Sequence, residues 1–541
     1  MLTTLAAPAF AGTWYIENGD ITVKAGKTGN DVTQNNETTY GDTGTVITGK
    51  SDKNTVTIEA KDEDDKVEVK LDNVNIDTSK QNKAAVSVTG SGDTTIELDG
   101  DNKLKSGSAH AGLEHNKTDT SGELTIQDND KNGSLKAAGG QYGAGIGGAG
   151  VNDAQVKITG GKITATGGEY GAGIGGGFKG SGDVTISGGE IHANGGNYGA
   201  GIGGGDYSSG KVTISGGEIN ATGGYLGAGI GGGEKGRGDV TITGGEITSA
   251  TGGKYGAGIG GGKEGRGDVT IEGNTEVNAA GGAGGAGIGG GYVAKNNSNQ
   301  ITIKSNENGS PTVNAVGGSR DKTTKFGGAG IGAGGDSTAT TDITLEGKVT
   351  INATAGKDNA AIGANGIEQE FPGLAGGTSI TRKDSDKNDI SPLPGDNVPD
   401  TDTPSGGGST GGDSTGGDSA GGDSAGGGSS GGGSADASVQ ESVFPGLVVT
   451  DKDGQRISYT SIRDNNVLSL RVGRFTASLR ASLSTLRQLR AEGIDTITFQ
   501  TILCSTTLSV DELLAMGGED SEVVLTHHIR SSTLTVGGRA V

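Results

Sequence analysis

The sequence GAGIGGG occurs at residues 171–177, 199–205, 227–233, 256–262 and 285–291. Related heptads stand at residues 143–149, 328–334 and 359–365. Successive central isoleucines of the complete copies are therefore 28 or 29 residues apart. A constant period of this size is typical of a solenoid, in which each repeat forms one coil and coils stack to bury their apolar faces.

The rest of each repeat carries strand-like patterns. A Val-Thr-Ile run, as at residues 184–186 and 212–214, is followed by Gly-Gly and a second apolar pair such as Ile191 and Ala193. Alternation at a period of two predicts β-strands, and Gly-Gly pairs separate them. Three short strands and no helical segment per repeat predict a mainly β protein, a right-handed parallel β-helix. Ile174 is then expected to stack between Ile146 and Ile202, about 4.8 Å from each.

The β-helix is predicted to span residues 12–377. It begins before the regular repeats, because Val86 and Leu113 occupy the place of the later isoleucine. Residues 1–11 end in Ala-Phe-Ala, which resembles a cleavage site, and predict the remnant of a signal peptide. Residues 378–441 contain four prolines and then Gly-Gly-Asp-Ser repeats, which predict a flexible Gly/Ser/Asp linker.

Residues 442–541 differ in composition and predict a small α/β accessory domain. Leu479, Leu483 and Leu486 share one face of a predicted helix. Ser509 and Glu512 form a capping-box pattern before a second apolar run. Cys504 has no catalytic partner in the sequence pattern and is expected to be a buried thiol.

Composition excludes several classes of protein. The formal net charge of −22 disfavours nucleic acids and anionic membrane surfaces as partners. A single cysteine excludes a disulfide framework. The sequence contains no run of eighteen apolar residues, so no transmembrane helix is expected. The 113 glycines lack a period of three, which excludes collagen. A secreted or cell-surface location is expected.

Two rows of carboxylates follow the repeat and are candidate metal ligands. Glu190, Glu218 and Glu246 share one position in consecutive coils, and Asp183, Asp239 and Asp268 share another, which Lys211 interrupts. Like charges at this spacing repel by about 1 kcal/mol in water. Calcium would remove the repulsion, since it takes carboxylate and carbonyl oxygens. The alternative is a solvated charged face.

Four tyrosines are candidate carbohydrate contacts. Tyr142, Tyr170, Tyr198 and Tyr255 each precede the central isoleucine by four residues. A row of exposed rings would stack on sugar rings. However, strand parity places Tyr170 on the same side as Ile174, and an aromatic stack at the edge of the core is the alternative.

Catalysis is not predicted. Polysaccharide lyases and hydrolases need a local cluster of carboxylates, with a general base or acid at the scissile bond. The carboxylates here recur with the repeat, and no two of the five histidines stand at a recognisable ligand spacing. The irregular N-terminal coils leave the alternative of a catalytic site open.

Longer stretches also resemble a known family. TTIELDGDNKLKSG at residues 94–107, AGLEHN at 111–116 and LTIQDNDKNGSLKAAGGQYGAGIGG at 124–148 are similar to bacterial surface proteins described as carbohydrate-binding-domain proteins. This resemblance implies a pectate-lyase-like β-helix and an association with calcium and acidic plant polysaccharide. IDTITFQT at residues 494–501 resembles a module appended to secreted proteins of gut Firmicutes.

The sequence therefore predicts a secreted, non-catalytic β-helix that binds extracellular polysaccharide, with calcium as a possible cofactor. A polysaccharide lyase or hydrolase and a structural stalk or adhesin are the alternatives.

Overall fold

The computed structural model describes residues 11–295, 298–393, 395–396 and 447–540, the last range with gaps at 452–453, 458, 465, 473–475, 502–503, 517–520 and 528–531. The chain divides into two compact units, Met1–Thr401 and Asp402–Val541. Residues 1–10 of the predicted signal-peptide remnant and residues 397–441 of the predicted linker lie outside the described residues.

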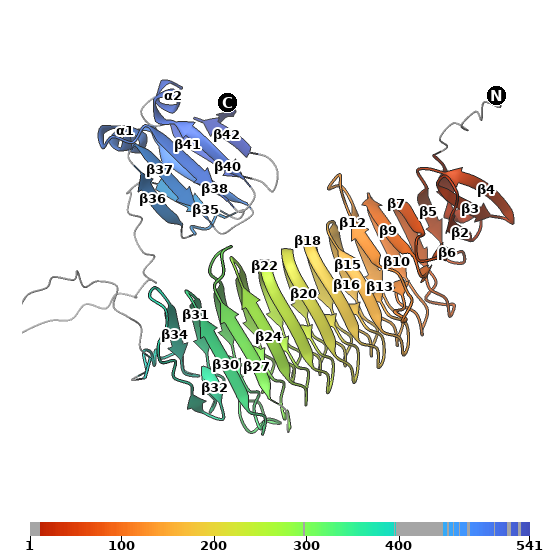
Figure 1. Ribbon diagram of the computed structural model, residues 1–541, viewed down its shortest axis with the longest axis horizontal. Helices are drawn as coiled ribbons and strands as arrows, with labels where there is room; N and C mark the ends of the chain where they lie inside the picture. The colour runs from red at the N-terminus through yellow and green to blue at the C-terminus, as the bar shows by residue number, and fades with distance from the viewer. Residues whose placement is uncertain are drawn as a thin grey trace, which may run out of the picture. The chain divides into compact units, whose positions relative to one another are not determined.

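The first unit is the predicted parallel β-helix, and its coils stack in sequence order (Figure 1). One wall is built from short strands that carry the central isoleucines. Ile146, Ile174 and Ile202 pair in register, and the same register continues through Ile362. Val86 and Leu113 precede them in the same row, as predicted. These strands are β2 (Ile21–Ala25), β6 (Val56–Ala60), β8 (Val86–Gly90), β11 (Leu113–His115), β14 (Ile146–Gly147), β17 (Ile174–Gly175), β19 (Ile202–Gly203), β21 (Ile230–Gly231), β23 (Ile259–Gly260), β26 (Ile288–Gly289), β29 (Ile331–Gly332) and β32 (Ile362–Ala364).

A 19-stranded sheet supplies the other walls of the coils. In three coils the two predicted strands join into one long strand, whose register shifts near the Gly-Gly pair. The strands are β1 (Thr13–Tyr15), β5 (Val46–Ser51), β7 (Lys66–Asp77), β9 (Asp93–Asp99), β10 (Asp101–Lys105), β12 (Leu124–Gln127), β13 (Ser134–Ala138), β15 (Ala154–Ile158), β16 (Lys162–Thr166), β18 (Gly182–Asn194), β20 (Gly210–Thr222), β22 (Gly238–Thr251), β24 (Gly267–Glu272), β25 (Glu276–Ala280), β27 (Asn299–Lys304), β28 (Thr312–Val316), β30 (Thr341–Glu346), β31 (Thr350–Thr354) and β34 (Ser379–Lys383).

The Ile-Gly step explains why the heptad is so rich in glycine. Ile202 points into the core and is 0% exposed. Gly203, the next residue, has a φ of 129°, a conformation that side chains disfavour. A Cβ atom there would lie 2.1 Å from the carbonyl oxygen of Gly231 in the next coil. Only glycine lets the coils approach this closely.

Antiparallel strands cover both ends of the stack. At the N-terminal end, β3 (Asn30–Gln34) and β4 (Glu37–Asp42) extend β2, and a 3-10 turn spans Ile16–Asn18. At the C-terminal end, β33 (Ile367–Glu368) folds back on β32. Such strands shield edges that would otherwise offer unpaired backbone groups.

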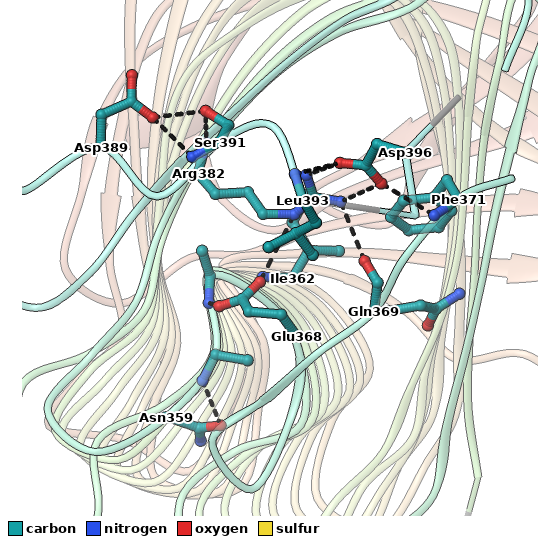
Figure 2. A network of polar contacts seen from close by, with 12 residues as sticks. Asn359, Ile362, Glu368, Gln369, Phe371, Arg382, Asp389, Ser391, Leu393 and Asp396 are labelled. Atoms are coloured by element: carbon teal, nitrogen blue, oxygen red, sulfur yellow. Dashed lines mark hydrogen bonds and ion pairs between the residues drawn. The ribbon is translucent and has the colours of Figure 1, made fainter. Parts of the chain in front are cut away.

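A buried arginine completes the C-terminal end (Figure 2). Arg382 is 0% exposed and pairs in register with Ala353, a core position of the preceding coil. Its guanidinium binds the Asp396 carboxylate with both terminal nitrogens, and Nη2 also donates to the Gln369 carbonyl at 3.0 Å. Burial raises the pKa of Asp396, but hydrogen bonds from Arg382 and the Phe371 N–H outweigh it and hold the pKa below its usual value. The linker therefore does not begin at residue 378 as predicted, because residues 379–383 form a further β-helix strand and residues up to 396 cover the stack.

The second unit has the predicted mixture of strands and helices. One sheet orders β35 (Leu447–Thr450), β38 (Ala477–Ser482), β41 (Glu522–His527), β42 (Ser532–Val536) and β43 (Arg539–Ala540), and the other orders β36 (Thr460–Asp464), β37 (Val467–Arg471), β39 (Thr496–Gln500) and β40 (Ser505–Ser509). The helices are α1 (Leu483–Ala491) and α2 (Val510–Ala515).

Two details of the second unit differ from prediction. Leu479 lies in β38 and not in a helix, because the buried Ala477, Leu479 and Ala481 alternate and α1 begins only after the cap at Ser482. Cys504 is half-buried at the start of β40, so the expected buried thiol is wrong. The predicted cap at Ser509 is confirmed, since its side chain accepts a hydrogen bond from the Glu512 N–H.

The isoleucine row gives a first testable prediction. Ile202→Asp would bury an uncompensated charge between Ile174 and Ile230, at a cost of about 3–5 kcal/mol. Because each coil is stabilised by its neighbours, several coils should unfold together. The measurement is thermal unfolding followed by circular dichroism. Asn197→Asp is the matched control, since Asn197 is exposed in the same coil. Equal melting curves for the two variants would contradict the inward position.

The C-terminal cluster gives a second prediction. Arg382→Met leaves the buried Asp396 without its counter-ion and should cost about 3–5 kcal/mol locally. Hydrogen exchange should accelerate in β34 and β31 while β20 keeps its protection. Adding Asp396→Asn removes the unpaired charge and should restore part of the protection. If the double variant exchanges as fast as Arg382→Met, the ion pair is not the cause.

Candidate functional site

The predicted tyrosine row exists, and its rings stack on one another. The Tyr142 and Tyr170 ring centroids lie 5.2 Å apart with an interplanar angle of 8°, and those of Tyr170 and Tyr198 lie 5.0 Å apart at 11°. Phe178 packs edge-on against Tyr142 and Tyr170. All of these rings are half-buried. The arrangement is the aromatic stack at the edge of the core that the sequence left as the alternative.

This stacking changes how the row can contact a ligand. Both faces of Tyr170 are covered, one by Tyr142 and the other by Tyr198. A sugar ring cannot lie flat on such a tyrosine, so only ring edges and hydroxyl groups face outward. Burial, and then the charge of Glu169, raises the pKa of the Tyr170 hydroxyl, which therefore stays protonated and can donate a hydrogen bond.

Further aromatic side chains lie in the same turns of the coils. Tyr207 and Tyr225 are 51% and 49% exposed. Tyr292 stacks on Tyr255 with centroids 5.3 Å apart, and Tyr225 meets Tyr255 edge-on at 5.4 Å. We call the following set the aromatic stripe: Tyr142, Tyr170, Phe178, Tyr198, Tyr207, Tyr225, Tyr255 and Tyr292.

Sequence reasoning missed half of the aromatic stripe, although the signal was available. Phe178 and Tyr292 are the first residues after a GAGIGGG heptad, and Tyr207 is the second. Each first residue donates its N–H to the carbonyl of the residue that precedes the heptad of the coil before it, as Phe178 does to Tyr142 and Tyr292 to Tyr255. The row of residues that follow the heptads therefore contacts the row of residues that precede them, one coil away.

An inserted loop fixes the far end of the aromatic stripe. Lys254 lies over the rings of Tyr225 and Tyr255, at 5.6 and 5.0 Å from their centroids, and pairs with Asp321 at 2.9 Å. The Tyr255 hydroxyl is 2.6 Å from the Thr323 Oγ1. The hydrogen bond to Thr323 lowers the pKa of Asp321 and leaves it fully ionised. This is the insertion that lengthens the repeat between residues 288 and 331.

The aspartate row is balanced by basic side chains of the protein. Asp183, Lys211, Asp239 and Asp268 stack in register. Asp183 pairs with Lys117 at 3.0 Å and with Lys211 at 3.4 Å. Asp268 pairs with Arg237 at 2.6 Å and with Arg266 at 3.8 Å. The repulsion that suggested calcium here is therefore relieved without a metal ion.

The glutamate row is also in register, from Glu190 through Glu218 and Glu246 to Glu276. Lys162 heads the row and pairs with Glu190 at 2.7 Å, and His192 Nε2 lies 3.0 Å from the same oxygen. The hydrogen bond from Lys162 lowers the pKa of Glu190. Metal binding by the six candidate ligands of the two rows stays a prediction: Glu190, Glu218, Glu246, Asp183, Asp239 and Asp268.

A groove of about 250 Å³ lies over the aspartate row. Its charged lining consists of Lys117, Asp153, Asp183, Lys211, Arg237 and Asp239, with serine hydroxyls between them. The groove therefore offers hydrogen-bond donors and acceptors of both charges.

The described residues contain no group of three or more His, Cys, Asp or Glu side chains arranged to hold a metal ion. Within the same ranges, no helix has the length and apolar character needed to cross a membrane.

Comparison with protein families identifies the repeat. Five consecutive segments match the model described as Beta helix repeat: residues 156–178, 184–206, 212–234, 240–263 and 269–292. Comparisons with curated proteins and with solved structures gave no match. Each matched segment begins in the first strand after one heptad and ends within the turn after the next, which is one coil of the structure. The chain is thus a parallel β-helix repeat protein.

Proposed function

We propose that this protein is a secreted or surface-located, non-catalytic β-helix that binds extracellular polysaccharide along the aromatic stripe. The observation that carries the proposal is the concentration of aromatic residues in the stripe. Only 3% of the chain is aromatic, yet seven of its ten tyrosines belong to the stripe. Tyrosine offers an apolar face and a hydrogen-bonding hydroxyl, the two features that a sugar ring complements.

The repeat suits a polymeric ligand. Coils recur about every 4.8 Å along the axis, so equivalent side chains are presented at a constant spacing. A polymer of repeated sugar units would meet the same kind of contact from coil to coil. Tyr207 and Tyr225 are the expected stacking residues because they are the most exposed, whereas the Tyr142–Tyr198 stack would contribute edges and hydroxyls.

An acidic polysaccharide needs positive charge on a protein of net charge −22. The groove over the aspartate row provides Lys117, Lys211 and Arg237, and the Lys211 side chain is 66% exposed. Aspartates of the same lining balance these cations, so we propose the exposed Lys211 as the contact in the groove for carboxylate groups of such a ligand. This contact should weaken as ionic strength rises, because exposed charges are screened.

A non-catalytic role is part of the proposal, and the burial of Asp206 supports it. Asp206 is a carboxyl group of the kind that general acids use, since burial and then the charge of Glu234 raise its pKa to about 6. It is only 2% exposed, however, and cannot touch a bound chain.

Substitution of the exposed tyrosines tests the proposal. Tyr207→Ala and Tyr225→Ala should each weaken retention on the bound polysaccharide, by about fivefold if one ring contributes about 1 kcal/mol. Affinity electrophoresis against neutral and acidic polysaccharides gives the readout. Tyr15→Ala and Tyr40→Ala are matched controls, because both tyrosines are exposed but lie outside the stripe.

Equal retention of all four variants would overturn the role of the stripe. A wild-type protein that no polysaccharide retains would favour a structural stalk. Release of reducing ends or unsaturated products by the wild-type protein would show an enzyme.

A further inference from the structure

One position of the repeat carries a different side chain in each successive coil. The first residue after successive heptads is Phe178, Asp206, Glu234, Lys263 and then Tyr292. Asp206 and Glu234 are neighbours in this row, one coil apart. Their N–H groups bond to the carbonyls of Tyr170 and Tyr198, also one coil apart, so the two residues share one position in consecutive coils.

Both carboxylates are buried. Asp206 is 2% exposed and Glu234 is 7% exposed. The Asp206 Oδ1 atom is fully buried and has no hydrogen-bond partner among the described residues. An ionised oxygen in that state has lost its water without compensation, which is one of the costliest arrangements in a protein.

The nearby basic residues do not compensate Asp206. Lys263 pairs with Glu234 at 3.4 Å and is shared with Glu264 at 3.3 Å. Lys179 Nζ lies over the Phe178 ring, 5.1 Å from its centroid, and Lys235 Nζ lies over the Tyr207 ring at 4.6 Å. A hydrogen bond from the Tyr207 N–H, Lys235 and Lys179 lower the pKa of Asp206, but burial and Glu234 outweigh them. Asp206 Oδ1 is therefore left without a partner and next to a like charge.

Backbone carbonyls stack beside the same row. A Cβ atom at Gly205, the residue before Asp206, would lie 1.9 Å from the carbonyl oxygen of Gly177. At Gly233, the residue before Glu234, it would lie 2.0 Å from the carbonyl oxygen of Gly205. Glycine turns thus bring carbonyl oxygens of the neighbouring coil close to the backbone directly before each of the two carboxylate residues. Carboxylate and carbonyl oxygens together form the ligand set that hard divalent cations prefer.

We propose that Asp206 and Glu234 form a buried site for a hard divalent cation, with carbonyl oxygens of the adjoining glycine turns as further ligands. The cation gives Asp206 Oδ1 the partner that it lacks and offsets the repulsion between Asp206 and Glu234. The site is separate from the glutamate and aspartate rows and does not depend on the proposed polysaccharide binding.

Thermal unfolding of the full chain tests the site. Wild-type protein freed of metal with EDTA should gain a few degrees in Tm at pH 7.5 when calcium or magnesium is added, because a ligand bound only by the folded state stabilises it. Asp206→Asn should abolish the gain. Its Tm without metal should equal or exceed that of metal-free wild type, since the amide removes a buried charge. Glu307→Gln is the matched control, because Glu307 is exposed and lies outside both carboxylate rows, and it should keep the full gain.

The stability of the metal-free protein should also depend on pH. The folded pKa of Asp206, about 6, lies above the value of about 3.9 for an unfolded aspartate. Ionisation in the folded state therefore costs stability, and this cost is absent below about pH 4 and complete above about pH 6. Without metal, the free energy of unfolding should fall as the pH rises through that range.

Two outcomes would overturn the site: no gain in Tm with either cation at pH 7.5, or an equal gain in Asp206→Asn. Calorimetric titration of calcium into wild type and Glu234→Gln gives an independent readout, with weaker binding expected for the variant. Failure of glycan retention would leave these results unaffected, so the two proposals can fail separately.

Discussion

The close approach of backbones at the Ile-Gly step is the constraint on which this β-helix depends. The isoleucine of each heptad is buried in the core with the apolar side chains of the other strands, and the glycine after it lets the carbonyl group of the next coil approach closely. Any side chain at that glycine would collide with the neighbouring backbone. The coils are therefore locked in one register, and every outward position becomes a row of closely spaced side chains along the axis.

In each row, side chains of the same kind therefore lie close to one another. Aromatic rings are accommodated by stacking, as in Tyr142, Tyr170 and Tyr198. Repulsion between like charges is relieved by basic side chains, either within the row, as Lys211 does between Asp183 and Asp239, or from another part of the chain, as Lys117 does for Asp183. Asp206 differs, because its buried Oδ1 has no partner and the neighbouring residue in the row is another carboxylate.

The repeat made much of this predictable from the sequence. The period placed Ile146 to Ile362 in one row and put the glutamates and aspartates in register, because equivalent residues of stacked coils must be neighbours. Contacts that do not follow the repeat could not be predicted. Arg382 reads as a linker residue, and only the fold of the chain end buries it against Asp396. Lys117 reaches Asp183 across 66 residues of sequence, and the faces of Tyr170 are covered by rings whose stacking a strand pattern does not specify.

A solenoid separates positions that hold the stack together from positions that are free to differ. The isoleucine and the glycine after it are the same in coil after coil because their environment is the same. The backbone of the first residue after the heptad donates its N–H to a carbonyl one coil away, and every residue type except proline can do this. Its change from phenylalanine to aspartate, glutamate, lysine and tyrosine therefore costs the stack little, except where a charge is buried. Burying Asp206 beside Glu234 is unfavourable without a partner for Asp206 Oδ1, and the proposed divalent cation would supply that partner.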